Sequence, residues 1–506
     1  MAADPGDAAG GATTRPEIAH ADRVPAAAWV IAGCYVALEL TVSGRYGFQQ
    51  DELYFLVADR HLAFGYVDQP PLAVLLTRTT DLFGVNPTAI RILPALAGGA
   101  VVILSARLAA LLGGARTARI LTALSVAISP IFLGAMHVGN TTPYDLLAWS
   151  VVTVGVVTAL LRDRPRWWLG AGVAAGIGIN DEYLVLTLLA ALVLAIVSTS
   201  AHRRALATRW PWLGGGIALV IWLPNLIWQF ANGWPQLTMA ASLRADNSSA
   251  GDYAAGIPGQ LLYAGLLGIP LLIAGFVNLW RSSQLRFLAV AATIIVVYVL
   301  AWIPGKVYYA DGILPVLLAA GSGSAERWID RGRRPVRRRV LLGGLAVVGT
   351  ILLLPAVLPV LPVTRLHTVN GATSIADGVG WPQLAEEVAA QDISLSRAGH
   401  PPTSIFTGAY AEASAVELYG AKQRLPPVIS AHNMFWHWGP GNAPDSTVLY
   451  VDAYDQLKPY FANCRRLAVY NPPYQVQNDW NDLDIGVCTG PTEPWRSLWP
   501  KLKHYE

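Results

Sequence analysis

Residues 337–362 read RRRVLLGGLAVVGTILLLPAVLPVLP, three arginines followed by a run of 23 residues without a charge. A helix rises about 1.5 Å per residue, so about 20 apolar residues cross the hydrocarbon core of a bilayer. This run is therefore predicted to be a transmembrane helix. Arginines gather on the cytoplasmic side of such helices, so the start of the run is predicted to lie inside the cell.

The same kind of apolar block recurs along most of the chain. The composition agrees, because 54% of the 506 residues are hydrophobic and only 14% are charged, which excludes a string of soluble domains. About eleven transmembrane helices are predicted, at residues 25–44, 92–112, 120–136, 144–161, 167–179, 183–199, 212–230, 258–280, 287–302, 311–324 and 340–362.

Arginine placement gives the orientation of these helices. With the N-terminus inside, every arginine-rich connection falls on the cytoplasmic side, and an odd number of helices exports the C-terminus. Residues 1–24 lack a cleavable signal pattern and are predicted to be a disordered cytoplasmic tail. We expect a multi-pass protein of the plasma membrane, with residues 25–362 in the membrane.

Residues 363–506 differ in composition and are predicted to form an extracytoplasmic α/β domain. Short β-rich runs alternate there with helical stretches such as 412–418. The runs are 404–406, 427–429, 448–451, 466–469 and 485–487. Cys464 and Cys488 lie in this region, where an oxidising compartment favours a disulfide; two buried free thiols are the alternative.

The first predicted outer loop carries two adjacent carboxylates, Asp51 and Glu52, between aromatic residues. A carboxylate shielded from water has a raised pKa and can accept a proton from a hydroxyl, so the pair is a candidate general base with its partner. The alternative is a helix N-terminus, where acidic residues interact favourably with the helix dipole. Both interpretations remain open on spacing alone.

Further polar residues follow at the same membrane face. Asp68 and Gln69 precede two prolines, and Asp68 either caps a helix or binds a cation or a sugar hydroxyl. Lys306 lies at an outer helix end, on the side of the membrane that basic residues usually avoid. This unusual position indicates that Lys306 binds an anion such as phosphate. Other substrate or metal candidates are Tyr66, His137, Asn140, Asp145, Asp181 and Glu182.

Ionisable side chains at membrane depth cost free energy and are usually retained for function. The clustering of these residues at one face therefore predicts an outward-facing cavity at the membrane surface. The sequence has neither a phosphate-binding glycine loop nor a dinucleotide fingerprint, and it has no Cys or His spacing typical of metal sites. Nucleotide use and a nucleic-acid partner are therefore not predicted.

Several ordered motifs resemble the bacterial members of the protein O-mannosyltransferase superfamily, which are GT-C fold glycosyltransferases related to the enzyme that adds aminoarabinose to lipid A. The resemblance covers about residues 40–325, and the C-terminal region is similar to an actinobacterial-type branch. The motifs are DELY at 51–54, FGYVDQPPL at 64–72, TPYD at 142–145, PNLIWQ at 224–229, NGWP at 232–235 and GKVYY at 305–309.

The resemblance implies transfer of a hexose or pentose, with inversion, from a polyprenyl-phosphate donor to an acceptor hydroxyl at the outer face. It implies that Asp51 is the catalytic aspartate, acting as general base or orienting the acceptor; the adjacent Glu52 is predicted to be its catalytic partner. Donor and phosphate binding fall to Lys306, Tyr308, Tyr309, Gln69 and Arg45.

The chain also departs from the family pattern. Glu182 stands where relatives usually carry a lysine, and Gln69 lacks the positive charge seen in some relatives. Both changes make the site less basic and leave room for a divalent cation. The acceptor is a glycan, a glycolipid or a protein; the alternative function is a transporter, flippase or binding protein for a lipid-linked sugar.

Overall fold

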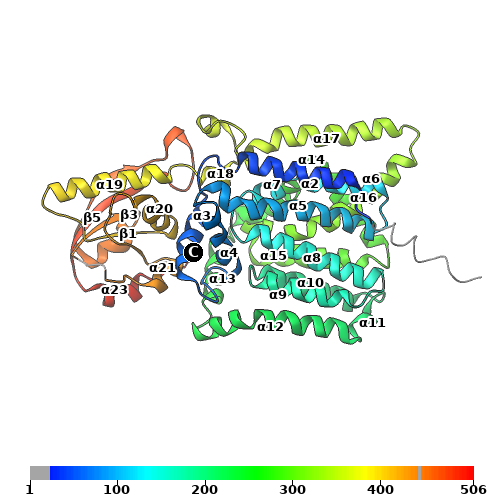
Figure 1. Cartoon of the computed structure of the whole chain (residues 1–506), viewed down its shortest axis with the longest axis horizontal. Helices are drawn as coiled ribbons and strands as arrows, with labels where there is room; N and C mark the ends of the chain where they lie inside the picture. The colour runs from blue at the N-terminus through cyan, green and yellow to red at the C-terminus, as the bar shows by residue number, and fades with distance from the viewer. Residues whose placement is uncertain (1–22, 443–445, 506) are drawn as a thin grey trace, which may run out of the picture.

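The computed structural model describes residues 23–442 and 446–505, and it consists of a helical bundle with a smaller α/β domain at one end (Figure 1). Apart from Arg23 and Val24, the predicted tail 1–24 lies outside the described residues. The helices of the bundle are α2 (Ala26–Val42), α5 (Pro87–Leu111), α6 (Arg116–Ala127), α7 (Pro130–Met136), α8 (Thr142–Leu161), α9 (Trp167–Ile179), α10 (Leu184–Ser198), α12 (Arg209–Ala231), α14 (Ala250–Arg281), α15 (Arg286–Trp302), α16 (Leu314–Asp330) and α17 (Pro335–Val357).

Each of the eleven predicted apolar blocks overlaps at least one of these helices. By length and composition, α5, α8, α12, α14 and α17 can cross a membrane, and the bent pair of α6 and α7 adds a sixth span. The apolar helices α2, α9, α10 and α15 are shorter. The predicted mostly helical membrane class is confirmed, while the number of eleven spans stays a prediction.

Two of the predicted blocks are interrupted. The block 120–136 forms α6 and α7, which meet at an angle of 56°, because Pro130 excludes the helical conformation at the residue before it. The block 258–280 lies in α14, where Gly265 adopts a left-handed φ of +73° that a residue with a side chain disfavours.

The outer helices present apolar side chains to their surroundings. Phe230 on α12 is 74% exposed, and Ile351 on α17 is 67% exposed. Large apolar side chains on one face of a long helix are typical of contact with lipid tails. Inside the bundle, small residues allow close crossings: Gly275 of α14 faces the Leu317 carbonyl of α16, and Gly321 of α16 faces the Leu271 carbonyl.

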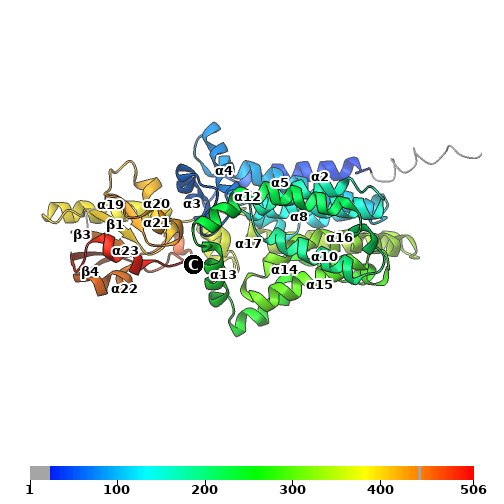
Figure 2. The same cartoon turned by 90° about the horizontal axis from the view of Figure 1, so that it is seen from below.

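Short elements lie at the end of the bundle next to the α/β domain (Figure 2). In the first loop, α3 begins with a capping box in which Gln49 and Glu52 satisfy each other's backbone N–H groups. These elements are α3 (Gln50–Ala58), η1 (Asp59–His61), α4 (Leu72–Thr77), η2 (Arg78–Leu82), α13 (Pro235–Asp246) and η3 (Pro304–Ile313). The short helix α11 (Arg203–Leu206) lies at the opposite end of the bundle (Figure 1).

The C-terminal region is the predicted α/β domain, and all five predicted strands are present. The sheet order is β2-β1-β3-β5-β4, with β1 parallel to β2 and β3, and β5 antiparallel to β3 and β4. A disulfide joins Cys464 on β4 to Cys488 directly opposite on β5. The strands are β1 (Ser404–Thr407), β2 (Val428–Ser430), β3 (Thr447–Val451), β4 (Phe461–Tyr470) and β5 (Leu483–Pro491).

Helices flank this sheet and connect it to the first loop. The Tyr410 ring of α20 lies 4.8 Å from that of Tyr54 on α3, and His61 stacks on Trp438 of α21 with 4.6 Å between ring centroids. The α/β domain therefore packs directly against the first loop. The remaining elements of this region are η4 (Val363–Thr368), α18 (Thr373–Ala376), α19 (Trp381–Arg397), α20 (Tyr410–Gly420), α21 (Asn433–Trp438), α22 (Tyr454–Leu457), η5 (Lys458–Tyr460), η6 (Pro473–Gln475) and α23 (Trp495–Leu502).

Candidate active site

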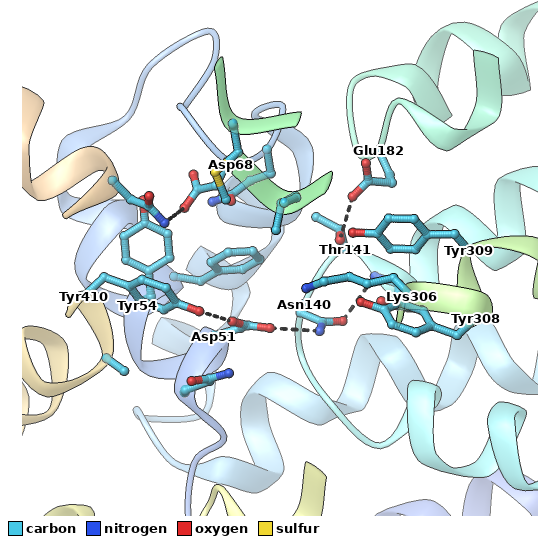
Figure 3. A pocket seen from close by; sticks show the side chains of 18 of the residues that line it. Asp51, Tyr54, Asp68, Asn140, Thr141, Glu182, Lys306, Tyr308, Tyr309 and Tyr410 are labelled. Carbon is cyan, nitrogen blue, oxygen red and sulfur yellow. Dashed lines mark hydrogen bonds between the residues drawn. The ribbon is translucent and has the colours of Figure 1, made fainter. Parts of the chain in front are cut away.

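A cavity of about 520 Å³ lies where the bundle meets the α/β domain. Its walls come from parts of the chain that are distant in sequence: the first loop, the ends of the bundle helices with α13 and η3, and the loops after β1, after β2 and before β5 (Figure 3). The predicted site residues that line it are Asp51, Asp68, Gln69, Asn140, Asp145, Glu182, Lys306, Tyr308 and Tyr309.

Asp51 lies between the two halves of the cavity. One carboxylate oxygen accepts a hydrogen bond from the Tyr410 hydroxyl at 3.0 Å, and the other accepts one from the Asn140 side chain at 3.2 Å. Burial raises the pKa of Asp51, while these two hydrogen bonds and the charge of Lys306 lower it. The result is a fixed, partly shielded carboxylate, the property required of a base that takes a proton from a hydroxyl.

Lys306 supplies the positive charge of the cavity. It extends from η3 toward Asn140, with Asp51 on one side and Glu182 on the other (Figure 3). Among the described residues that line the cavity, it is the one Lys or Arg. The rings of Tyr308 and Tyr309 pack edge to face beside it, with 4.8 Å between centroids. This group can hold an anion against aromatic walls.

Asp68 and Gln69 lie on the side of the first loop. The Asn433 side chain donates a hydrogen bond to Asp68 at 3.4 Å. Burial raises the pKa of Asp68 to about 7, and the neighbouring Tyr54 hydroxyl counteracts the shift. Gln69 is 5% exposed, and its Nε2 has no hydrogen-bond partner among the described residues. A buried donor of this kind is costly unless a ligand satisfies it.

Glu182 and Asp145 lie on the side of the membrane helices. Glu182 accepts hydrogen bonds from the Thr141 hydroxyl at 3.2 Å and from the Tyr183 N–H at 3.0 Å. Burial raises the pKa of Glu182 to about 7, against the influence of Thr141 and Lys306. Asp145 accepts a hydrogen bond from the Trp149 indole at 3.0 Å.

Glu52 does not line the cavity. Its two oxygens pair with the Arg91 guanidinium at 2.7 and 2.8 Å, and they also accept hydrogen bonds from the N–H groups of Gln49 and Gly139. Because all of its hydrogen-bonding capacity is used by protein groups in a buried setting, we assign Glu52 a structural role in place of the predicted catalytic one.

His137 belongs to the same buried network. Its Nδ1 lies 3.0 Å from a carboxylate oxygen of Glu39, and its Nε2 lies 3.5 Å from Arg91. Its predicted role in substrate or metal binding therefore does not fit its position, since both ring nitrogens face protein groups away from the cavity lining.

Three further candidates also lie away from the cavity lining. Arg45 donates to the backbone carbonyls of Pro359 and Val360, each at 3.1 Å, instead of facing the cavity. The Tyr66 hydroxyl lies 3.3 Å from the Ala63 N–H. Asp181 is fully buried behind the cavity wall, and no hydrogen-bond partner is found for either oxygen in the described part of the chain.

The α/β domain contributes residues that are not among the predicted site residues. Tyr410 follows β1, and His432 and Asn433 follow β2, so all three lie at the carboxyl ends of parallel strands. Ligands of open α/β sheets bind at this edge. The predicted strands 404–406 and 427–429 were a signal for these positions, but only the fold shows that this edge faces the membrane helices.

No metal site is evident from the side chains alone. No group of three or more His, Cys, Asp or Glu residues with metal-ligand geometry occurs in residues 23–442 and 446–505.

Comparisons with known proteins agree with this geometry. Residues 68–228, less than half of the chain, match the family model described as dolichyl-phosphate-mannose-protein mannosyltransferase. A comparison with curated proteins gives no match.

Solved structures match over most of the chain. The structure of ArnT from Cupriavidus metallidurans bound to undecaprenyl phosphate matches with a TM-score of 0.58 and 16% identity, covering 90% of this chain and 97% of that one. The Archaeoglobus fulgidus oligosaccharyltransferase matches with a TM-score of 0.52 and 12% identity, covering 87% of this chain and 69% of that one.

These matches confirm the resemblance to the GT-C superfamily and the predicted fold class. The family model and the fold together support glycosyl transfer as the general activity of a multi-pass membrane protein.

Proposed function

We propose that this chain, which has the GT-C fold, transfers a hexose or pentose from a polyprenyl-phosphate donor to an acceptor hydroxyl, with inversion at the anomeric carbon. One observation carries the proposal: a shielded carboxylate, Asp51, and a lysine, Lys306, lie in the same cavity beside an apolar groove. Base and cation are the two groups that such a displacement requires.

Each step of the reaction has a candidate residue. The acceptor oxygen forms the new bond to the anomeric carbon while its proton passes to Asp51. The bond from that carbon to the phosphate oxygen breaks, and its electron pair leaves with the polyprenyl phosphate. Lys306 stabilises the negative charge of the departing phosphate, with Tyr308 and Tyr309 beside it.

The apolar groove supports a lipid-linked donor. It has a volume of about 390 Å³ and runs between α10, α12, α13 and α15. Asp68, Glu182 and Tyr309 line both this groove and the catalytic cavity, so the two spaces are adjacent. A polyprenyl chain in the groove places its phosphate near Lys306. The structure of ArnT was determined with undecaprenyl phosphate, a lipid of this class.

The orientation in the membrane follows the arginines. We place the N-terminus in the cytoplasm and the α/β domain outside, because the arginine-rich connections all lie at the end of the bundle opposite the cavity. Acceptors that the proposal covers are therefore glycans, glycolipids or proteins of the outer face.

A divalent cation is compatible with the charges of the cavity. Six carboxyl side chains line it beside one lysine, so a cation that enters with the donor phosphate would find oxygen ligands. Chelation by EDTA tests this part: a loss of transfer that Mg²⁺ or Mn²⁺ restores indicates a cation requirement, and unchanged transfer excludes it.

The main experiment follows a radiolabelled sugar from a panel of polyprenyl-phosphate sugars to a membrane extract. The wild type is compared with Asp51→Asn, which removes the base but keeps the shape of the side chain. Asp81→Asn, an exposed position in η2, is the matched control. We expect transfer to fall by at least about a hundredfold in Asp51→Asn, since general-base catalysis contributes about that much or more, and to persist in the control.

The outcomes separate the two candidate functions. Equal transfer by the wild type and Asp51→Asn, with equal melting temperatures, would remove Asp51 from the mechanism. Tight binding of a polyprenyl-phosphate sugar without transfer from any donor would instead favour a carrier or binding protein for lipid-linked sugars.

A further inference from the structure

Apart from the hydrogen bond from Tyr410 to Asp51, the wall of the cavity that belongs to the α/β domain has no part in the reaction described so far. Tyr410, His432 and Asn433 line it, and they follow the parallel strands β1 and β2. His432 and Asn433 are 3% and 1% exposed, so these polar groups are built into the wall and do not belong to a solvated surface. Parallel strands of open sheets bind ligands at this edge.

The two halves of the cavity lie on opposite sides of Asp51. Figure 3 shows Tyr410, Tyr54 and Asp68 on one side, and Lys306, Tyr309 and Glu182 on the other. An inverting displacement brings the nucleophile from the side opposite the leaving group. If the phosphate lies beside Lys306, the acceptor has to approach from the side of Tyr410 and Asp68.

The polar groups of this side suit an uncharged, hydroxyl-rich ligand. Within the described part of the chain, the Gln69 Nε2 is a buried donor without a hydrogen-bond partner, and Asp68 and Asn433 add an acceptor and an amide next to it. The rings of Tyr54 and Tyr410 form an aromatic surface, which is amphipathic and packs well against sugar rings. In the described lining, the cationic Lys306 lies on the far side of Asp51 and leaves the carboxyl groups here unbalanced.

We propose that the carboxyl ends of β1 and β2 form the acceptor half of the site, and that this half binds the sugar ring of an uncharged carbohydrate. The inference rests on the proposed glycosyl transfer and adds the class of acceptor. Negatively charged acceptors, such as phosphorylated glycolipids or uronic acids, are disfavoured because their charge would lie beside Asp68, where the described lining of the cavity holds no lysine or arginine.

Asn433 offers a clean test of the acceptor half. Its backbone has a φ of +47°, a left-handed conformation that Asn and Gly tolerate better than other residues. Asn433→Gly therefore removes the side chain without backbone strain, which Asn433→Ala would add. Arg424→Gly is the matched control, because Arg424 also has a left-handed φ, of +55°, and is exposed in the same domain.

The experiment uses the full-length protein and the polyprenyl-phosphate sugar that supports transfer. Octyl β-glucoside and octyl β-glucuronide are the probes, since they differ only in a hydroxymethyl group replaced by a carboxylate. We expect kcat/KM for the glucoside to exceed that for the glucuronide by about tenfold or more. We expect Asn433→Gly to raise the acceptor KM about tenfold and to change the donor KM by less than about twofold.

Several outcomes of these measurements would refute the inference. Equal use of the two glycosides would overturn the inference, and so would an effect of Asn433→Gly on the donor KM alone or on neither KM. If only a membrane extract accepts the label, the same KM measurements are made by diluting the extract. A labelled polypeptide or phosphorylated glycolipid in that extract would then refute the uncharged carbohydrate. No transfer by the wild type to any acceptor would refute the proposed function itself.

Discussion

At the scale of single residues, the adjacent acids Asp51 and Glu52 have different surroundings because they lie on a helix. Consecutive side chains of an α-helix point about 100° apart, so Asp51 and Glu52 can contact different neighbours. Asp51 faces the cavity and bonds to Tyr410 and Asn140, whereas Glu52 faces Arg91. In the proposed mechanism the two carboxylates therefore have separate roles: Asp51 accepts the proton, and Glu52 holds the first loop in place.

Tyr410 tunes Asp51, and its removal has a predictable effect on the pH dependence of transfer. The hydrogen bond from the Tyr410 hydroxyl stabilises ionised Asp51, so Tyr410→Phe raises the pKa of that carboxyl. Because the base acts when ionised, the acidic limb of the pH–rate profile should move to higher pH, by about half to one unit. Tyr419→Phe, on the same helix and outside the cavity, should leave the limb in place. An unmoved limb in Tyr410→Phe would show that this hydrogen bond does not act on the base.

Arg91 and Glu52 form a buried ion pair whose loss should destabilise the protein. The Arg91 side chain is 5% exposed and that of Glu52 is 0% exposed. Arg91→Met leaves a buried carboxylate unpaired, which costs about 3–5 kcal/mol and should lower the melting temperature in detergent by several degrees. Arg60→Met breaks the exposed pair with Glu417 and should cost about 0–1 kcal/mol. Similar melting temperatures for the two variants would contradict the structural role of Glu52.

The sequence predicted cavity residues correctly where they belong to motifs that occur in a recognisable order along the chain. Asp51, Asp68 and Lys306 stand in ordered motifs at one membrane face, and the fold brings them into one cavity. Arg45 and His137 also lie near that face, but their side chains bond to backbone carbonyls and to Glu39. Side-chain direction depends on packing partners from distant segments, which spacing along the chain does not contain.

At the scale of elements, the hydropathy pattern predicted where the helices lie, but it did not predict where they bend or break. Apolar blocks of about 20 residues mark where the chain crosses the bundle, whereas breaks such as the one between α6 and α7 depend on a single proline. The five strands could be predicted from their alternation, but which edge of the sheet faces the cavity could not. Tyr410 and Asp51 are 359 residues apart, and only tertiary contacts bring them together.

The crossing of α14 and α16 depends on two glycines. A Cβ atom at Gly275 would overlap the Leu317 carbonyl, which is backbone and cannot rotate away. Gly275→Ala should therefore separate the helices and cost about 1–3 kcal/mol, measured as a lower melting temperature in detergent. Gly343→Ala on α17 is the control, since no atom lies within 4 Å of its Cβ position. Equal melting temperatures would show that the crossing adjusts without cost.

At the scale of the whole molecule, the net charge of the cavity changes near neutral pH. Burial raises the pKa values of Asp68 and Glu182 to about 7. Below that pH both carboxyl groups are neutral, and above it both are negative, so an anionic phosphate meets growing repulsion as the pH rises. Lys306 alone cannot balance them within the described lining.

Binding of undecaprenyl phosphate should report this change. We expect its Kd to rise between pH 6 and pH 8. We expect Glu182→Gln to reduce this rise by about fivefold, which corresponds to about 1 kcal/mol of repulsion. Glu493→Gln, in an exposed ion pair with Lys501, should follow the wild type. Identical pH dependence in wild type and Glu182→Gln would mean that Glu182 does not face the phosphate.

The bonds from Asn140 and Tyr410 to Asp51 have a consequence for how the protein is made. A ribosome adds residues in order, so Asp51 and the membrane helices are synthesised long before Tyr410. A nascent chain with its helices already inserted still lacks the second partner of its base and one wall of its cavity. If the proposed transfer is correct, a donor lipid that reaches such an unfinished chain meets an incomplete site, so we expect transfer to begin only after synthesis and folding have finished.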